Sequence, residues 1–133
     1  MSQIINESGF VEDTFSNLVP LGLADYSGSG ALELAREDDP NAVAAHFETL
    51  QFITIRFGTS ADGRGFSIAK ALRALGYQGH LRASGHILVD QFRAARRCGF
   101  DDVEISATQA ERNPEHQWQA VPLGAGYQSL VLS

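Results

Sequence analysis

The sequence predicts an α/β domain with a small parallel sheet of about four strands joined by right-handed helical crossovers. Short apolar, β-branched segments alternate with amphipathic helical segments, which is the pattern of βα units. Two of the helical segments each end in a glycine followed by an aromatic residue, at Gly76-Tyr77 and Gly99-Phe100. The 133 residues, of which 44% are apolar and 20% charged, fit one globular domain with its own core.

Strands are expected near residues 32–35, 52–57, 80–84 and 102–106. The second is the clearest, because Phe52-Ile53-Thr54-Ile55-Arg56-Phe57 is rich in β-branched and aromatic residues. The sheet is either an open, flavodoxin-like sheet or a half-barrel with sequential strand order. The connections are short and similar, which favours sequential order.

Three helices are expected between these strands. Asp39 is a suitable N-cap for a helix over residues 40–50, with proline in its first position. The next helix spans about residues 65–75 and ends at Gly76, which is suited to a left-handed C-terminal cap. The third runs over about residues 87–98.

The domain organisation follows from these elements. Residues 1–30 are expected to be irregular apart from a short strand, and residues 31–106 form the repeated βα core. Residues 107–133 contain a short helix at about 111–117 and then a tail punctuated by glycine and proline.

The formal net charge of −6 is unevenly distributed. Residues 1–50 carry nine acids and one base, Arg36, whereas residues 51–100 carry eight bases and two acids. Residues 101–133 carry five acids and one base. The acidic flanks argue against nucleic-acid binding and favour a local basic pocket for a small anion or an acidic partner. The alternative is that the arginines solvate helix faces and pair with the acidic segments.

An anion site is predicted where the second expected strand turns into its helix. The segment Asp62-Gly63-Arg64-Gly65-Phe66-Ser67 directs backbone N–H groups and the positive end of the helix dipole to one spot. Arg64 and Ser67 add side-chain donors. The predicted anion-binding residues are Asp62, Gly63, Arg64, Gly65, Phe66, Ser67 and Arg82.

Arg82 enters this site through the topology of a parallel sheet. Ligands bind beyond the carboxyl ends of the strands, where the loop 58–64, the loop 84–86 and the stretch after Ser106 meet. Arg82 would then supply a second positive charge. Each assignment has a structural alternative: Asp62 only caps the helix, and Arg82 crosses the sheet to pair with an acid.

His86 and Asp90 are the candidates for acid–base catalysis. His86 is equally explained as a solvated loop residue. Asp90 is explained by its place in the first helical turn, where the dipole stabilises a carboxylate. Cys98 lies in a last turn and is better explained by packing than by nucleophilic chemistry.

Several other classes of site are not predicted. Four histidines without a His-x-x-x-His pair and a single cysteine predict no metal site and no bound cofactor. The glycines around Arg64 lack the Lys-Ser/Thr of a nucleotide-binding P-loop and the third glycine of a dinucleotide fingerprint. The longest uncharged apolar run, residues 18–24, is too short for a membrane span. With no signal-peptide pattern, we expect a cytoplasmic protein.

Four motifs together resemble one family of small bacterial proteins, the domain of unknown function 934. They are Asp62-Gly63-Arg64-Gly65-Phe66-Ser67, Gly79-x-Leu81-Arg82-Ala83-x-Gly85, Asp90-Gln91 and Arg97-Cys98-Gly99-Phe100-Asp101. The similarity covers about residues 30–105, and Tyr127-Gln128 resembles the family's terminal Tyr-Gln. The chain departs from the family pattern at Gly58, where proline is expected, and at His86, where aspartate is frequent.

The resemblance implies a cytoplasmic accessory role in assimilatory sulfite or sulfate reduction. Our first hypothesis is that the anion pocket binds sulfite, sulfate or a phosphate ester, and that the protein delivers this anion to sulfite reductase or docks on that enzyme. Members of the family are labelled as oxidoreductases of sulfite reduction. One thiol and no cofactor motif favour a protein that is not itself a redox enzyme. Two alternatives stay open: an isomerase or lyase using Asp62, His86 or Asp90, and a non-catalytic interaction module. We also predict a homodimer, because a half-barrel leaves sheet edges uncovered.

Overall fold

The computed structural model describes residues 2–58, 63–85, 87 and 89–119. The strands are β1 (Ser2–Asn6), β2 (Gly9–Val11), β3 (Leu21–Gly22), β4 (Ala31–Leu34), β5 (Phe52–Phe57), β6 (His80–Gly85) and β7 (Asp102–Ser106). The α-helices are α1 (Pro40–Ala44), α2 (Arg64–Ala74), α3 (Phe92–Arg97), α4 (Ala107–Arg112) and α5 (Glu115–Gln119), and two 3-10 turns are η1 (Leu23–Asp25) and η2 (Val89–Gln91).

The strands form one sheet in the order β2-β1-β7-β6-β5-β4-β3. From β3 to β7 neighbouring strands are parallel and follow the chain order, whereas β1 and β2 are antiparallel at the edge of β7. The α/β class is confirmed, and the four expected strands are β4 to β7. The sheet has seven strands rather than about four, and its parallel part has sequential order rather than the flavodoxin-like order.

Residues 1–30 are less irregular than expected, which corrects the predicted domain organisation. They contain three strands, and β1 pairs with β7 so that Ile5 lies opposite Val103. Gly9, at a φ of 110°, closes the hairpin between β1 and β2. The sequence signal is weak because β1 holds only two buried apolar residues, and its stability comes from pairing with a strand about 100 residues away.

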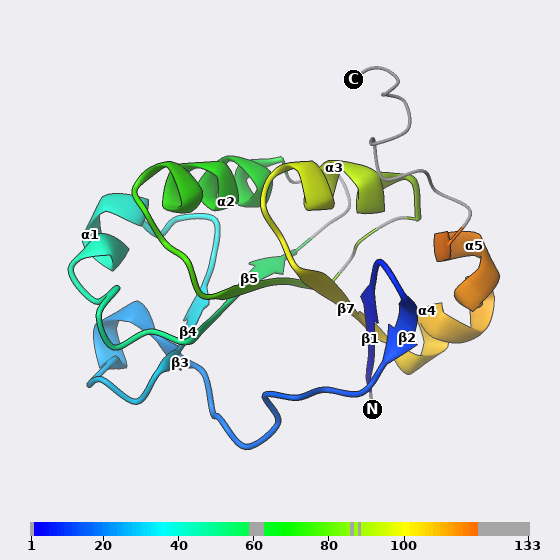
Figure 1. Cartoon of the computed structure of the whole chain (residues 1–133), viewed down its shortest axis with the longest axis horizontal. Helices are drawn as coiled ribbons and strands as arrows, with labels where there is room; N and C mark the ends of the chain where they lie inside the picture. Colours follow the sequence, from blue (N-terminus) through cyan, green and yellow to red (C-terminus); the bar gives the residue numbers. More distant parts are fainter. Residues whose placement is uncertain (1, 59–62, 86, 88, 120–133) are drawn as a thin grey trace.

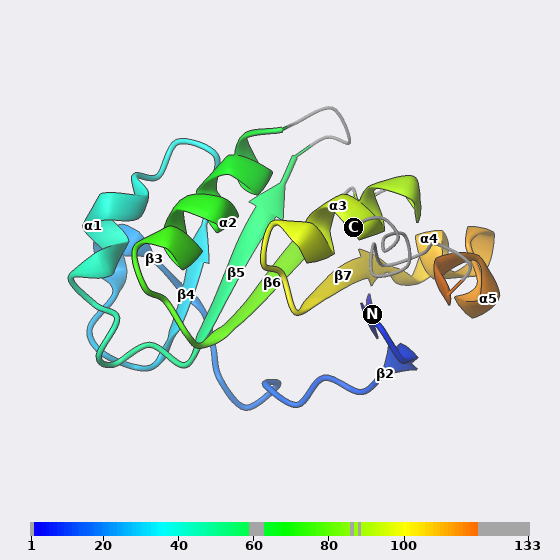
Figure 2. The same cartoon turned by 45° about the horizontal axis from the view of Figure 1, so that its top comes forward.

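The helices α1, α2 and α3 lie on one face of the sheet (Figure 1, Figure 2). Alternate residues of each strand point to this layer, as Ile53 and Ile55 do in β5. They pack against helix residues such as Ile68 and Leu72, all with no exposed surface. The helices α4 and α5 lie beside β1 and β2 at one end of the sheet (Figure 1).

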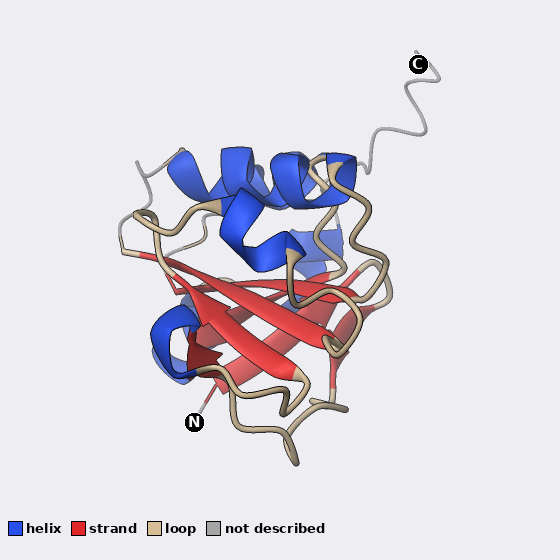
Figure 3. Ribbon diagram, turned by 90° about the vertical axis from the view of Figure 1, so that its left-hand side faces the viewer, coloured by secondary structure: helices blue, strands red, loops and turns tan. Residues whose placement is uncertain are grey.

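We call the opposite side the open face of the sheet. Figure 3 shows a loop, rather than helices α1 to α3, running along this side. This loop is the segment 12–20 between β2 and β3, and it contributes Asp13 and Phe15 to contacts on the sheet. Parallel sheets usually have both faces covered by helices, so the open face is the unusual part of this fold.

The predicted repeat is confirmed in atomic detail. Helices α2 and α3 end in the same motif, in which Gly76 and Gly99 have φ values of 107° and 106°. The amide of Tyr77 donates to the Leu72 carbonyl at 3.0 Å, and the amide of Phe100 donates to the Ala95 carbonyl at 3.1 Å. These bonds define Schellman caps.

One side chain joins the two repeats at the amino edge of the sheet. The Arg73 guanidinium donates to the carbonyls of Tyr77 and Gly79, to the carbonyl of Gly99 and to the carboxylate of Asp101, at 2.7–3.0 Å. The connections that lead into β6 and β7 are thereby fixed to each other.

The helix α2 agrees with the expected 65–75 to within one residue, but α1 and α3 are shorter than predicted. Asp39 does cap α1, accepting from the Asn41 amide at 3.0 Å, but α1 ends at Ala44. The chain then continues in turns, in which the Thr49 hydroxyl donates to the His46 carbonyl and competes with helical bonding. Two short helices, α4 and α5, replace the one expected at 111–117. Residues 120–133 lie outside the described part.

Two further observations concern the surroundings of the protein. No helix among the described residues is long and apolar enough to cross a membrane. The described sheet ends on β2 and β3, which have three and two residues. Edges this short limit strand pairing between chains, so the expected homodimer stays a prediction without support from the sheet edges.

Candidate functional site

The start of α2 brings together the core of the predicted anion site. Gly63 is the N-cap residue and makes no side-chain capping bond. Gly65 lies against β5 so closely that a Cβ atom there would be 2.5 Å from the Phe57 ring. Glycine is therefore required for the first turn of α2 to pack at the carboxyl end of this strand. Its amides face the edge where ligands of parallel sheets bind.

Arg64 and Ser67 are exposed on this first turn. The Arg64 Nε donates to the backbone carbonyl of Arg36 at 3.2 Å, so the loop that follows β4 adjoins the start of α2. Sequence reasoning did not place Arg36 here, because the contact joins loops that are 28 residues apart. Asp62 lies outside the described residues.

Phe66 belongs to the packing of the domain. Its half-buried ring lies 5.0 Å from the Phe57 ring and 6.4 Å from the Phe100 ring, between centroids. Only its backbone amide is available to the predicted site.

Arg82 is not brought to the start of α2. It is 2% exposed, and its guanidinium contacts Asp102 in two hydrogen bonds, of 2.9 and 3.1 Å, and Asp13 in one of 3.1 Å. Its neighbours Leu81 and Ala83 point to the helices, so alternation directs Arg82 to the open face. The alternative drawn from the sequence, a pairing of Arg82 with an acid, is what the structure shows.

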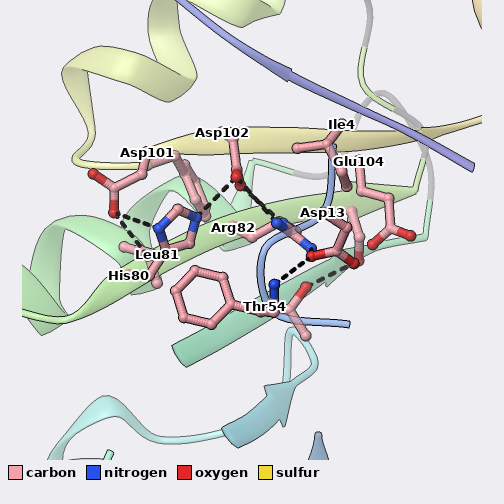
Figure 4. A network of polar contacts seen from close by, with 12 residues as sticks. Ile4, Asp13, Thr54, His80, Leu81, Arg82, Asp101, Asp102 and Glu104 are labelled. Carbon is pink, nitrogen blue, oxygen red and sulfur yellow. Dashed lines mark hydrogen bonds and ion pairs between the residues drawn. The ribbon is translucent and has the colours of Figure 1, made fainter. Parts of the chain in front are cut away.

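Arg82 is the centre of a charged network on the open face (Figure 4). His80 Nε2 lies 2.8 Å from the second oxygen of Asp102. The Arg82 guanidinium lies 4.9 Å from the centre of the Phe52 ring, and Phe15 stacks on that ring at 4.8 Å. The network thus holds the segment 12–20 on the sheet through Asp13 and Phe15.

Burial and pairing act in opposite directions on the ionisation of this network. Burial alone would raise the pKa of Asp102, but hydrogen bonds from His80 and Arg82 outweigh it and lower that pKa below its ordinary value. Burial also opposes the charge of Arg82, and its bonds to Asp102 and Asp13 instead raise its pKa. The pair therefore stays ionised inside the protein.

Beside this network the open face forms a hollow, which we call the polar groove. It has a volume of about 430 Å³, and its lining includes Ser2, Glu33, Thr54, Arg56, Ser84 and Glu104. A second hollow of about 270 Å³ lies next to it and shares Thr54 and Glu104. The groove lies over the carboxyl halves of β4 to β7, since Gly85 and Ser106 also line it.

The groove residues form cross-strand rows. Arg56 lies opposite Ser84, and Ser84 lies opposite Glu104, so a guanidinium, a hydroxyl and a carboxylate stand side by side. Arg56 Nη1 lies 3.2 Å from Glu33, and the Ser2 hydroxyl donates to Glu104 at 2.5 Å. The groove thus presents both signs of charge and several hydroxyl groups, which is the chemistry of a polar binding site.

A signal for the groove exists in the sequence. In each of β4 to β7 the polar residues occupy alternate positions, as Thr54 and Arg56 do in β5 or Arg82 and Ser84 in β6. Aligning the strands by these positions places all of them on one face. The predicted site lay in the loops at the strand ends, whereas the groove is lined mainly by residues of the strands.

The remaining candidates are not drawn into either region. Asp90 is exposed in η2, and His86 lies outside the described residues. Burial raises the pKa of Cys98 despite the nearby charges of Lys70 and Arg97, so its thiol is protonated at neutral pH, as a packing role requires. Within the described residues no group of three or more His, Cys, Asp or Glu side chains is arranged to hold a metal ion.

The fold and the site define an α/β protein with helices on one face of its sheet and a charged groove on the other. The chain belongs to the family described as bacterial protein of unknown function (DUF934), whose model matches residues 31–131. The match begins with β4, so β1, β2 and β3 precede it. Searches of curated proteins and of solved structures gave no match.

Proposed function

We propose that this protein is a cytoplasmic accessory protein of assimilatory sulfite reduction that binds a small oxyanion at the start of α2. The ligands that we propose are sulfite, sulfate or a phosphate ester, which carry the negative charge that this helix start favours. The observation that carries the proposal is the first turn of α2, where the amides of an eleven-residue helix begin at Gly63, which has no side chain to cap them, beside Arg64.

The local charges suit an oxyanion. The helix dipole and the first-turn amides favour negative charge at this point, and Gly63 and Gly65 bring no side chain that would cover them. The Arg64 side chain is held there by its 3.2 Å bond to the backbone carbonyl of Arg36, so one guanidinium group belongs to this corner. The carboxylate of Asp38 is already engaged, since it accepts from the Ala35 amide at 2.8 Å.

The pathway rests on the family resemblance, which supplies context rather than chemistry. The role we propose is to deliver the anion to sulfite reductase or to dock on that enzyme. The chain's single thiol, Cys98, is half-buried and supplies no electron-transfer pair. A non-redox role is therefore the simpler one.

Calorimetric titration tests the proposal. Sulfite, sulfate and phosphate are titrated into the wild type, Arg64→Ala and Lys70→Ala, which removes the same charge from an exposed position on the same helix. We expect Arg64→Ala to weaken binding at least about tenfold, since hydrogen bonds to charged groups contribute about 1.5–3 kcal/mol. Lys70→Ala should bind as the wild type does. Equal heats from wild type and Arg64→Ala would remove the proposal.

The two alternative functions receive less support. A basic docking face needs available arginines, but Arg73, Arg82 and Arg96 are engaged in ion pairs within the chain. An isomerase or lyase needs an acid–base group in a cavity, and the only described candidate, Asp90, is exposed and lines neither the polar groove nor the hollow beside it.

A further inference from the structure

We propose that the polar groove is a second binding site, which takes a small zwitterion of the amino-acid class. The anionic group of the ligand lies at Arg56, and its cationic group lies at Glu104. This site is separate from the oxyanion site at α2 and does not depend on it.

The row Arg56, Ser84 and Glu104 sets the geometry. Neighbouring strands lie about 4.8 Å apart, so the two outer Cα atoms are separated by about 10 Å. Arginine and glutamate side chains extend far enough from either end to meet one small molecule above Ser84. The Thr54 hydroxyl, which donates to Ser84 at 3.3 Å, adds a further polar group to the floor.

The end of the groove at Arg56, which would receive the anionic group of the ligand, is available. The Arg56 side chain is 69% exposed, and its partner Glu33 is 36% exposed. An exposed ion pair of this kind contributes little, so a ligand carboxylate can compete with Glu33 for the guanidinium. The buried Arg82 is different, because Asp102 and Asp13 already occupy it.

The end of the groove at Glu104, which would receive the cationic group of the ligand, is negatively charged. Glu104 lines both the groove and the neighbouring hollow, and Asp13 lies beside it in Figure 4. Two glutamates in the groove repel a simple anion, and Arg56 repels a simple cation. A molecule that carries both charges satisfies both ends, which is why we assign a zwitterion rather than a single ion.

Nuclear magnetic resonance tests the site with defined probes. Glycine, β-alanine and 4-aminobutyrate differ in charge separation, while acetate and methylammonium each carry one charge. We expect at least one amino acid to shift the amide signals of Thr54, Arg56, Ser84 and Glu104, and to do so at a lower concentration than acetate or methylammonium. Binding of acetate as strong as that of every amino acid would overturn the proposal, as would no shift at millimolar concentrations.

Variants separate this site from the oxyanion site. Arg56→Gln and Glu104→Gln should each weaken binding of the amino acid at least tenfold, and unchanged thermal unfolding verifies that both variants fold. Arg64→Ala should bind the amino acid as the wild type does, whatever it does to sulfite. If Arg56→Gln and Glu104→Gln bind normally, or if Arg64→Ala alone abolishes binding, the groove is not the site.

Discussion

The two faces of this sheet differ although the same strands build them. On the helix side Ile53, Ile55 and Val103 have no exposed surface and belong to the apolar core. On the open side their sequence neighbours Thr54, Arg56 and Asp102 form hydrogen bonds and ion pairs. The comparison indicates that apolar packing stabilises the helix face, whereas the open face combines a buried charged network with the exposed groove that we propose as a binding site.

The largest effect should come from breaking the buried pair on the open face. Arg82→Met leaves Asp102 buried without its main partner, and we expect a loss of about 3–5 kcal/mol in the free energy of unfolding. Urea denaturation measures it. The double variant Arg82→Met, Asp102→Leu removes both charges and should be more stable than the single variant. A single variant as stable as the wild type would mean that the open face contributes no structural charge pair.

A core truncation on the helix side should have an effect of similar or smaller size. Leu72→Ala removes a side chain with no exposed surface from α2 and should destabilise the protein by about 2–5 kcal/mol. Lys70→Ala, exposed on the same helix, is the matched control and should change stability by less than about 0.5 kcal/mol. If the two variants unfold alike, the helix layer is not the core.

A smaller effect is expected from acidification, which should destabilise the open face through Asp102. The pKa of Asp102 is lower in the folded protein than its ordinary value near 3.9. Its ionisation therefore stabilises the fold above that ordinary value, and this contribution is lost as the pH falls through the lowered pKa. Urea denaturation at pH 7 and at pH 3 measures the free energy of unfolding, which should fall more on acidification for the wild type than for Asp102→Asn. Equal losses would contradict the assigned ionisation.

The smallest effect is expected at the groove itself. Arg56→Gln breaks only the exposed pair with Glu33, and we expect a change in stability of at most about 1 kcal/mol. Thermal unfolding measures it. A much larger loss would show that the polar groove is a structural element, like the network around Arg82.

The core of the fold was predictable because its signals are local. The four parallel strands, the cap at Asp39 and the glycine ends of α2 and α3 each follow from a few adjacent residues. The hairpin of β1 and β2 was not predictable, because Ile4 and Ile5 pair with the distant strand β7 as well as with β2. After α1 the backbone continues in turns with bonds to the third preceding carbonyl, as from His46 to Val43 and from Phe47 to Ala44, which apolar periodicity does not distinguish from a helix.

The sites were predictable to a lesser degree. The first turn of α2 follows from its glycines, whereas the place of Arg36 beside it depends on the packing of two loops. Arg82 was identified as a notable charge, but its partner Asp13 is 69 residues away in an irregular segment. The groove needs the register of four strands, which alternation alone suggests but does not fix.

The guanidinium of Arg73 has a consequence for how this sequence can diverge. By tying Tyr77, Gly79 and Gly99 together, it fastens the rim of the sheet that lies farthest from both proposed sites. Loops at the opposite edge of the sheet, where α2 begins, can then accept substitutions without disturbing these connections. The edge that carries both proposed sites can therefore vary in sequence while the connections into β6 and β7 stay fixed.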